Sequence, residues 1–214
     1  MAYQFTTASS QYLSVASAPV TSTPLTLACW VYKTNVSDSN SGFISITNSV
    51  GSSSSFNLNH NATNNTIRAS VQQTGGVAQI AISTSGLTNN TWAHACGVFE
   101  SSTSRIAYCN GENSGTNTGS AVPESLNRIL IGVNWFGALQ SYANAIIAEV
   151  GIWNVALTAA EVASLAKGVT CNKIRPQNLV FYAPLIRDLQ DIKGGLIITP
   201  NNNPIVAAHP RVYA

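Results

Sequence analysis

The sequence predicts an all-β sandwich that is completed by one short α-helix. Most of its 214 residues fall into short segments that are alternating, β-branched or aromatic, and turn residues separate these segments. A single segment, residues 158–167, has helical periodicity and capping residues. With 45% hydrophobic residues, a chain of this length can bury a core without disulfides or metal ions. We therefore expect one large β-domain that spans residues 1–214.

The first half of the chain supplies many of the predicted strands. Residues 25–32 are almost entirely apolar, β-branched or aromatic, which is typical of a central strand. Residues 55–60 alternate between polar and apolar side chains, as a strand with one buried face does. The pair Gly75-Gly76 predicts a tight turn between strands at 66–71 and 77–82. Other strands are expected at residues 3–5, 11–15 and 42–47.

The second half continues this pattern up to an extended tail. Residues 92–99 and 106–109 are predicted to pair as a hairpin. Pro184 lacks a backbone N–H, which places the end of the strand at 179–185 at a sheet edge or bulge. Residues 201–214, rich in Asn and Pro, are expected to be extended and held by a neighbour, or else mobile. Further strands are expected at residues 128–133, 145–153 and 195–199.

The helical segment carries its own start and stop signals. Thr158 is the expected N-cap, and Glu161, three residues later, completes a capping box. Val162 and Leu165 share one face, and Gly168 ends the helix. A helix this short is not stable alone, so we expect it to pack on the outside of the sandwich.

The low content of charged residues limits the possible partners. Charged residues make up 8% of the chain, against roughly 25% in an average soluble domain. With a net charge of +2, little repulsion opposes association between copies, which favours a homo-oligomer. The basic residues are mostly scattered, whereas phosphate binding requires clusters. Nucleic acid is therefore not an expected partner.

Neither a membrane nor a secretion pathway is indicated. No run approaches the ~20 apolar residues that a membrane span requires. The first residues lack the basic and apolar regions of a secretory signal. We expect a protein that stays in the cell that makes it, or leaves by another route, such as lysis inside a virus particle.

The four cysteines have no metal-binding spacing. We expect them to be buried free thiols that pack as small apolar side chains. Cys96 and Cys109 lie on the two arms of one predicted hairpin, so a disulfide between them is the alternative.

An ordered set of short motifs resembles the laminin G-like domains of the concanavalin A-like lectin/glucanase group. Together the motifs cover roughly residues 3–168. They are residues 12–15 (YLSV), 27–32 (LACWVY), 91–95 (TWAHA), 107–111 (AYCNG), 131–132 (IG), 149–154 (EVGIWN) and 156–162 (ALTAAEV). The resemblance implies a two-sheet antiparallel jelly-roll sandwich, followed by a C-terminal strand region and an extended tail at about 170–214. Chains of this kind with a tail like residues 209–213 look like those encoded in phage genomes.

Catalysis is not expected. Enzymes of the resembled group carry paired carboxylates in a Glu-x-Asp-x-x-Glu pattern on one strand, and this sequence has no such pattern. Glu149 is the one strand acid in a matching motif, and we interpret it as a hydrogen-bonded structural residue. His94 is interpreted as a packed histidine. Some relatives bind Ca²⁺, but acidic residues are sparse here, so no metal or other cofactor is expected.

One loop is a candidate contact site. Trp30, Trp92 and Trp153 occupy positions that are core positions in the resembled family, so core packing is expected for them. Trp135 differs because relatives usually carry small polar residues in its loop. Aromatic and amide side chains gathered in a surface loop suggest contact with a sugar or a protein, and packing of the aromatic residues into the fold is the alternative. The candidate contact residues are Asn134, Trp135, Phe136, Tyr142 and Asn144.

Two functions are compatible with these observations. The first is a non-enzymatic virion protein, a phage capsid decoration or fibre protein that contacts capsid or other virion proteins. It would be assembled in the host cytoplasm and located on the virion. The alternative is a carbohydrate-binding module or adhesin that recognises surface glycans.

Overall fold

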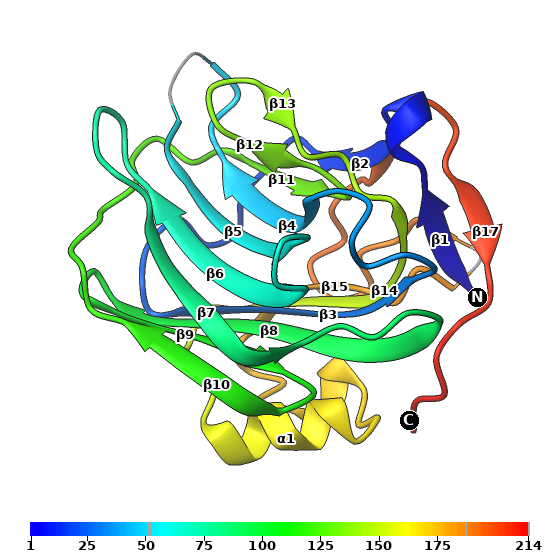
Figure 1. Ribbon diagram of the computed structural model, residues 1–214. Coiled ribbons are helices and arrows are strands. Elements are labelled where there is room, and N and C mark those ends of the chain that lie inside the picture. Colours follow the sequence, from blue (N-terminus) through cyan, green and yellow to red (C-terminus); the bar gives the residue numbers. More distant parts are fainter. Residues whose placement is uncertain (51–52, 187, 214) are drawn as a thin grey trace.

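Two antiparallel β-sheets pack face to face in the computed structural model, which describes residues 1–50, 53–186 and 188–213 (Figure 1). In this described part, one α-helix, α1 (Ala159–Ala166), lies outside the sandwich. The predicted two-sheet antiparallel sandwich with one short helix is therefore confirmed. No helix in the described part of the chain is long and apolar enough to span a bilayer.

The two sheets draw their strands from all parts of the chain. In spatial order, the first sheet contains β10 (Glu112–Asn117), β9 (Ser104–Cys109), β8 (Thr91–Ser101), β3 (Leu25–Lys33), β14 (Ala145–Trp153), β1 (Ala2–Phe5) and β17 (Ile205–Ala207), and β15 (Leu179–Ala183) also pairs with β14. The second sheet contains β16 (Thr199–Asn201), β2 (Tyr12–Val15), β11 (Arg128–Ile131), β4 (Ser41–Thr47), β5 (Ser55–Asn61), β6 (Thr66–Gln72) and β7 (Gln79–Gly86). The remaining elements are the hairpin β12 (Asn134–Trp135) and β13 (Leu139–Gln140) and two 3₁₀ turns, η1 (Thr7–Ser9) and η2 (Cys171–Lys173).

The main core lies between the sheets. Side chains alternate along a strand, so every second residue of the central strands points inward. The inward residues of β3 and β4 include Leu25, Leu27, Cys29, Val31, Ile44 and Ile46, all of them fully buried. Phe56 of β5 and Phe99 of β8 meet edge to face across the two sheets, with ring centroids 5.2 Å apart.

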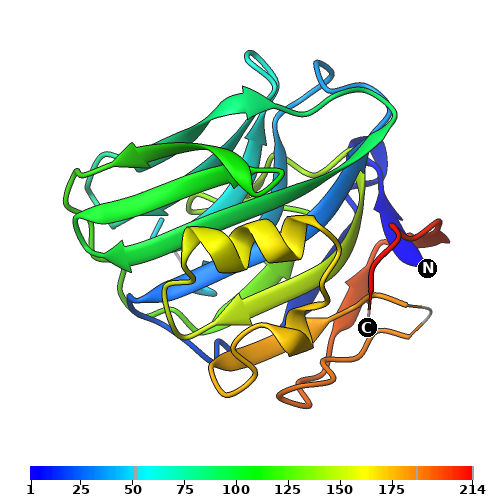
Figure 2. The same cartoon turned by 90° about the horizontal axis from the view of Figure 1, so that it is seen from below.

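A second core forms between the outer face of the first sheet and α1 (Figure 2). Val162 and Leu165 of the helix pack there with Trp153 of β14, whose Nε1 donates a hydrogen bond of 2.8 Å to the carbonyl oxygen of Ile174. The predicted capping box is present, because the Thr158 Oγ1 accepts from the Glu161 N–H and the Glu161 carboxylate accepts from the Thr158 N–H. The helix thus serves as a cover for apolar side chains that would otherwise face water.

Two of the tryptophans predicted to lie in the core do not. Trp30 and Trp92 are half-buried on the outer face of the first sheet. Trp30 packs against His94, and Trp92 packs against Tyr32 on the neighbouring strand. The prediction failed because these positions alternate with the inward residues and lie beyond the area that α1 covers. Of the tryptophans, all of which lie in the described residues, Trp153 alone is fully buried.

All four cysteines are buried and, within the described residues, none forms a disulfide, as expected. A Cys96–Cys109 disulfide is ruled out by the register, because Cys96 pairs with Tyr108 and packs in the second core, whereas Cys109 faces the main core. Burial raises the pKa of Cys109 to about 11.

The C-terminal strands depart from the sequence prediction. Of the predicted strand at 195–199, Ile197 forms only an isolated bridge to Gln190, and regular pairing begins at Thr199. The tail is extended, and two parts of it, β16 and β17, join the edges of the two sheets. β10 was not predicted, because its sequence Glu-Asn-Ser-Gly-Thr-Asn has no apolar alternation.

We expect Leu165→Ala to lower the free energy of unfolding by roughly 2–5 kcal/mol, because it leaves a cavity in the second core. Urea titration followed by tryptophan fluorescence measures the change. Lys167→Ala, at an exposed position at the end of the same helix, is the matched control and should cost less than about 0.5 kcal/mol. Equal losses in the two variants would contradict this role of α1.

Candidate functional site

The outer face of the second sheet is lined by buried polar side chains on β4, β5 and β6. Alternation places them opposite the inward apolar residues of the same strands. Ser45 donates to the Asn57 Oδ1, Asn57 donates to the Ser55 Oγ over 2.8 Å, and Asn59 donates to the Ser70 Oγ over 3.2 Å. These five residues, which we call the polar face, are no more than 6% exposed.

The hairpin β12–β13 lies over part of the polar face. Strand β12 contacts β4 and β5, and the Ser55 hydroxyl donates to the backbone carbonyl of Trp135 over 3.4 Å. The backbones approach closely at Gly42, where a Cβ atom would lie 2.4 Å from the backbone nitrogen of Asn134. This glycine therefore allows the hairpin to lie directly on the sheet. Figure 1 shows the hairpin beside β4 and β11.

Trp135 forms a cation–π contact with Arg128. The centre of the Arg128 guanidinium lies 4.2 Å from the centroid of the Trp135 ring. Arg128 starts β11, where Ile129 and Ile131 face the core. Its Nε and Nη2 atoms are buried and have no hydrogen-bond acceptor within the described structure. Burial lowers the pKa of Arg128, although a guanidinium keeps its charge at neutral pH.

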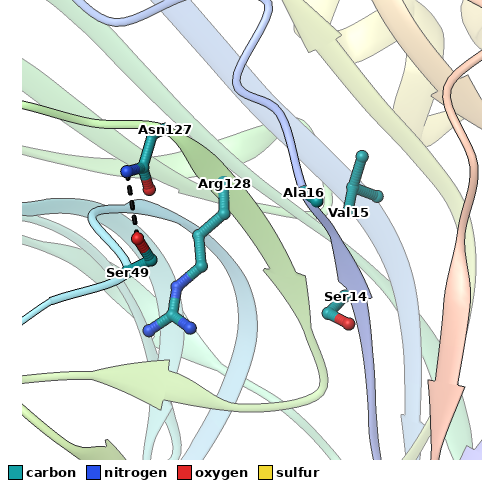
Figure 3. Close-up of a pocket in the computed structure, with 6 residues that line it drawn as sticks. All are labelled: Ser14, Val15, Ala16, Ser49, Asn127 and Arg128. Atoms are coloured by element: carbon teal, nitrogen blue, oxygen red, sulfur yellow. Dashed lines mark hydrogen bonds between the residues drawn. The ribbon is translucent and has the colours of Figure 1, made fainter.

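Arg128 also lines an open pocket of about 340 Å³ (Figure 3). The Asn127 amide donates to the Ser49 Oγ over 3.0 Å at one side of this pocket, and Ser14 lies on the other. We call this the Arg128 pocket; its lining residues are Ser14, Val15, Ala16, Ser49, Asn127 and Arg128. It combines a fixed cation, hydroxyl groups and an amide, which can donate to and accept from a polar ligand.

The structure divides the predicted contact residues among three places. Asn134, Trp135 and Phe136 belong to the hairpin beside Arg128; Asn134 is buried, and the two aromatic residues are half-buried. Tyr142 packs beside Tyr12, with ring centroids 6.1 Å apart. Sequence patterns did not predict the pocket residues, and the signal they offered was a single arginine at the start of a predicted apolar strand.

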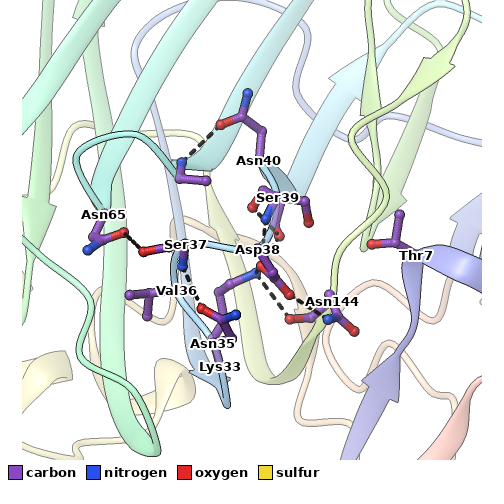
Figure 4. Close-up of polar contacts among 12 residues, drawn as sticks. Thr7, Lys33, Asn35, Val36, Ser37, Asp38, Ser39, Asn40, Asn65 and Asn144 are labelled. Carbon is purple, nitrogen blue, oxygen red and sulfur yellow. Dashed lines mark hydrogen bonds and ion pairs between the residues drawn. The ribbon is translucent and has the colours of Figure 1, made fainter.

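Asn144 belongs to a separate cluster around Lys33, whose side chain is fully buried. The Lys33 Nζ lies 2.9 Å from the Asp38 Oδ1, and it donates to the Ser41 Oγ over 2.8 Å and to the Asn144 carbonyl over 3.1 Å. The Asn144 amide donates to the other oxygen of Asp38 (Figure 4). The ammonium group thus binds all three of these oxygen atoms. It links the end of β3 to the segments at 34–41 and 141–144.

Within this ion pair, burial shifts the pKa of each partner, Lys33 and Asp38, in one direction, and hydrogen bonds and the charge of the other partner shift it in the opposite direction. Burial lowers the pKa of Lys33, and the hydrogen bond and charge of Asp38 partly offset that effect. Burial alone would raise the pKa of Asp38, but hydrogen bonds from Asn144 and Lys33 and the Lys33 charge outweigh it and lower the pKa. Burial together with the Lys33 charge lowers the pKa of the nearby His60 to about 4. The described residues contain no group of three or more His, Cys, Asp or Glu side chains that could hold a metal ion.

Glu149 is hydrogen-bonded, as interpreted from the sequence. It sits at a bulge of β14 with a φ of 54° and is 3% exposed. The Tyr182 hydroxyl donates to its Oε2 over 2.5 Å, and the Nε2 of His209 lies 3.1 Å from its Oε1. Burial raises the pKa of Tyr182, and the nearby Cys171 and Glu149 raise it further. His94, also buried, has its pKa lowered to about 3 by burial, which fits a packed neutral histidine.

A protein-family model matches most of this chain. A laminin G family model, described as the concanavalin A-like lectin/glucanases superfamily, matches residues 7–163. This match confirms the laminin G-like resemblance that the motifs indicated. No curated protein sequence matches the chain.

Solved structures of low sequence identity share the fold. A heptameric SAP-like pentraxin from Limulus polyphemus is 15% identical with a TM-score of 0.65, over 93% of this chain and 89% of that one. A putative carbohydrate binding protein from Bacteroides ovatus is 16% identical with a TM-score of 0.61, over 96% of this chain and 61% of that one. The CBM40 of the Ruminococcus gnavus IT-sialidase, bound to α2,3-sialyllactose, is 12% identical with a TM-score of 0.54, over 68% of this chain and 84% of that one. At these identities the likeness concerns the fold.

We expect Asp38→Asn to lower the free energy of unfolding at neutral pH by up to about 3 kcal/mol, because Lys33 would stay buried without its carboxylate. The pKa of Asp38 lies below its ordinary value of 3.8. Its ionised form therefore stabilises the fold above that pH, and this stability is lost as the pH falls through the folded-state pKa. Urea titrations at pH 7 and about pH 3 should show the difference between the two proteins shrinking in acid.

A double variant distinguishes the contribution of the ion pair to stability from that of local packing. Lys33→Met combined with Asp38→Asn removes both charges and should be more stable than Asp38→Asn alone. Asp188→Asn, at an exposed position, is the matched control and should change little. A double variant that is less stable than Asp38→Asn would count against this account of the cluster.

Proposed function

The chain belongs to the concanavalin A-like lectin/glucanases superfamily, and we propose that it is a non-enzymatic domain that binds surface carbohydrate at the Arg128 pocket. The observation that carries the proposal is the stacking of Arg128, which lines that pocket, on the Trp135 ring. Sugar binding needs an aromatic ring together with a few fixed polar groups. The pocket supplies hydroxyl groups from Ser14 and Ser49 and the amide of Asn127.

The fixed position of Arg128 supports this role. Its stacking on Trp135 holds the guanidinium in one orientation, so little conformational freedom is lost when a ligand binds. The ion pairs of the described residues do not include Arg128. Its charge is therefore not neutralised by a neighbouring carboxylate, so the guanidinium can attract polar oxygens of a ligand in the pocket.

The acidic residues support a role in binding without turnover. Glu149 is enclosed by Tyr182 and His209. Asp191, one of two acids that lie close together in the sequence, is 4% exposed, and its carboxylate accepts hydrogen bonds from the backbone N–H groups of Tyr182, Lys193, Gly194 and Leu196. Both carboxylates are engaged in holding the fold, whereas glycoside hydrolysis needs two that flank a bond.

A virion protein is the second candidate, as a phage capsid decoration or fibre protein assembled in the host cytoplasm. The observation that favours it is a surface with few charges and with exposed apolar side chains in the C-terminal segment, including Ile197 (83% exposed) and Ile205 (56% exposed). Such a surface suits contacts with capsid or other virion proteins. The two functions are compatible, because a protein on a particle surface can also bind host glycans.

Arg128→Gln should reduce carbohydrate binding at least about tenfold, because it removes both the charge and the ring contact. The measurement is a glycan array with neutral and acidic oligosaccharides, followed by calorimetry on any glycan that binds. Arg68→Gln is the matched control, since Arg68 is a half-buried arginine on β6 of the same sheet and lies outside the pocket. Binding that the two substitutions weaken equally, or an array without any binding, would contradict the proposal.

The virion candidate predicts that the chain is part of a particle. Mass spectrometry of purified particles from the source should detect its peptides, and genes for capsid and portal proteins should lie beside its gene. A purified chain that stays monomeric and copurifies with no particle would count against this candidate and would leave the carbohydrate proposal intact.

A further inference from the structure

The strand β17 forms an open edge of the first sheet. It pairs with β1 through Ala2–Ala207, Tyr3–Val206 and Gln4–Ile205. On its other side no strand of the described chain is paired with it. Figure 1 shows β17 at the periphery of the molecule. An open edge presents unpaired backbone N–H and C=O groups, which readily pair with another chain.

The side chains of β17 are also uncovered. Ile205 is 56% exposed and Val206 is 45% exposed, although neighbouring residues of a strand point to opposite faces. Both faces of this apolar strand are therefore in contact with water. Eleven large apolar side chains are exposed in the described structure, and six of them lie in the C-terminal segment: Ile186, Ile192, Ile197, Ile205, Val206 and Tyr213.

Three other edge strands, β16, β7 and β10, are protected in ways that β17 is not. β16, an edge of the second sheet, has Pro200 at its centre and polar residues on both sides of it, and a proline at an edge blocks further pairing. β7 and β10 cover one another, since a Cβ atom at Gly115 would lie 1.8 Å from the carbonyl oxygen of Ile82. β17 has the sequence Ile-Val-Ala, without proline or charge. Although β17 is short, its open edge and uncovered apolar side chains leave it able to pair with another chain.

The low net charge of the C-terminal segment favours a second copy of this chain as the partner of the open β17 edge. Residues 186–213 contain three basic and two acidic residues, Arg187, Lys193, Arg211, Asp188 and Asp191, which give a net charge of +1. Two copies would therefore meet with almost no repulsion. A polyanion or an acidic membrane surface would require a concentration of positive charge, which this segment lacks.

We propose that two copies of the chain pair antiparallel through β17, so that their first sheets join into one continuous sheet. A two-fold axis through the middle of this three-residue strand places Val206 opposite the same residue of the second copy and Ile205 opposite Ala207. The contact is self-complementary, as the interface of a two-fold dimer must be. It leaves the Arg128 pocket, on the second sheet, open in both copies.

Sedimentation velocity over a range of concentrations tests the dimer. The wild-type chain should sediment as a dimer. Val206→Lys should weaken the dimer at least about tenfold, because it places like charges opposite one another. Val77→Lys is the matched control, since Val77 is 81% exposed in the turn between β6 and β7, and it should leave the dimer unchanged. A wild-type monomer at about 100 µM, a concentration far above that needed by stable dimers, would overturn the proposal.

Cross-linking provides a second test that does not depend on destabilising the edge. Val206→Cys should form a disulfide-linked dimer under mild oxidation, because the two thiols would face one another across the axis. Val77→Cys should not, and the four native cysteines are buried and unreactive under these conditions. A dimer that withstands Val206→Lys, or that Val206→Cys does not cross-link, would place the interface elsewhere and overturn the assignment to β17.

Discussion

The packing of the two sheets against each other is the contact on which the rest of the structure depends. It buries the inward side chains of both sheets in one continuous core. Because side chains alternate along each strand, the residues that face the core also determine which residues face outward. The outer face of the first sheet then presents Trp153, Ala28 and Cys96, which require a cover, and α1 supplies it. The outer face of the second sheet presents the polar face, over part of which the hairpin β12–β13 lies.

Lys33 and Arg128 show two ways in which this chain, with few charged residues, accommodates a cation that is partly or fully removed from water. Lys33 is enclosed by Asp38, Ser41 and Asn144, so its desolvation is offset within the protein. Arg128 is half-buried against Trp135 without a carboxylate, and two of its nitrogen atoms have no acceptor in the described structure. Lys33 therefore stabilises three segments of the fold, whereas the charge of Arg128 meets an aromatic ring in place of a carboxylate.

The sequence was informative wherever one strong local pattern determined the structure. The strand at 25–32 and the capping box at Thr158 and Glu161 were correctly predicted, since alternation and capping act over a few residues. Trp30 and Trp92 were misplaced because the extent of the cover on the outer face depends on where α1 docks, which no local pattern encodes. β10 was missed because edge strands need little apolar content.

In the candidate site, too, local patterns identified single residues but not their partners, which are distant in the sequence. Trp135 stood out in the sequence as an aromatic residue in a loop, but the residue on which it stacks is at the start of β11, and the pocket beside them also draws on β2 and the loop after β4. Asn144 was grouped with Trp135 by its proximity in the sequence, yet it faces Lys33 and Asp38 at another part of the molecule. A binding surface assembled from several strands depends on their register, and the register is set by the core. The alternating core residues of the central strands are therefore readable in the sequence, while their outward neighbours acquire a role only once the sheets have paired.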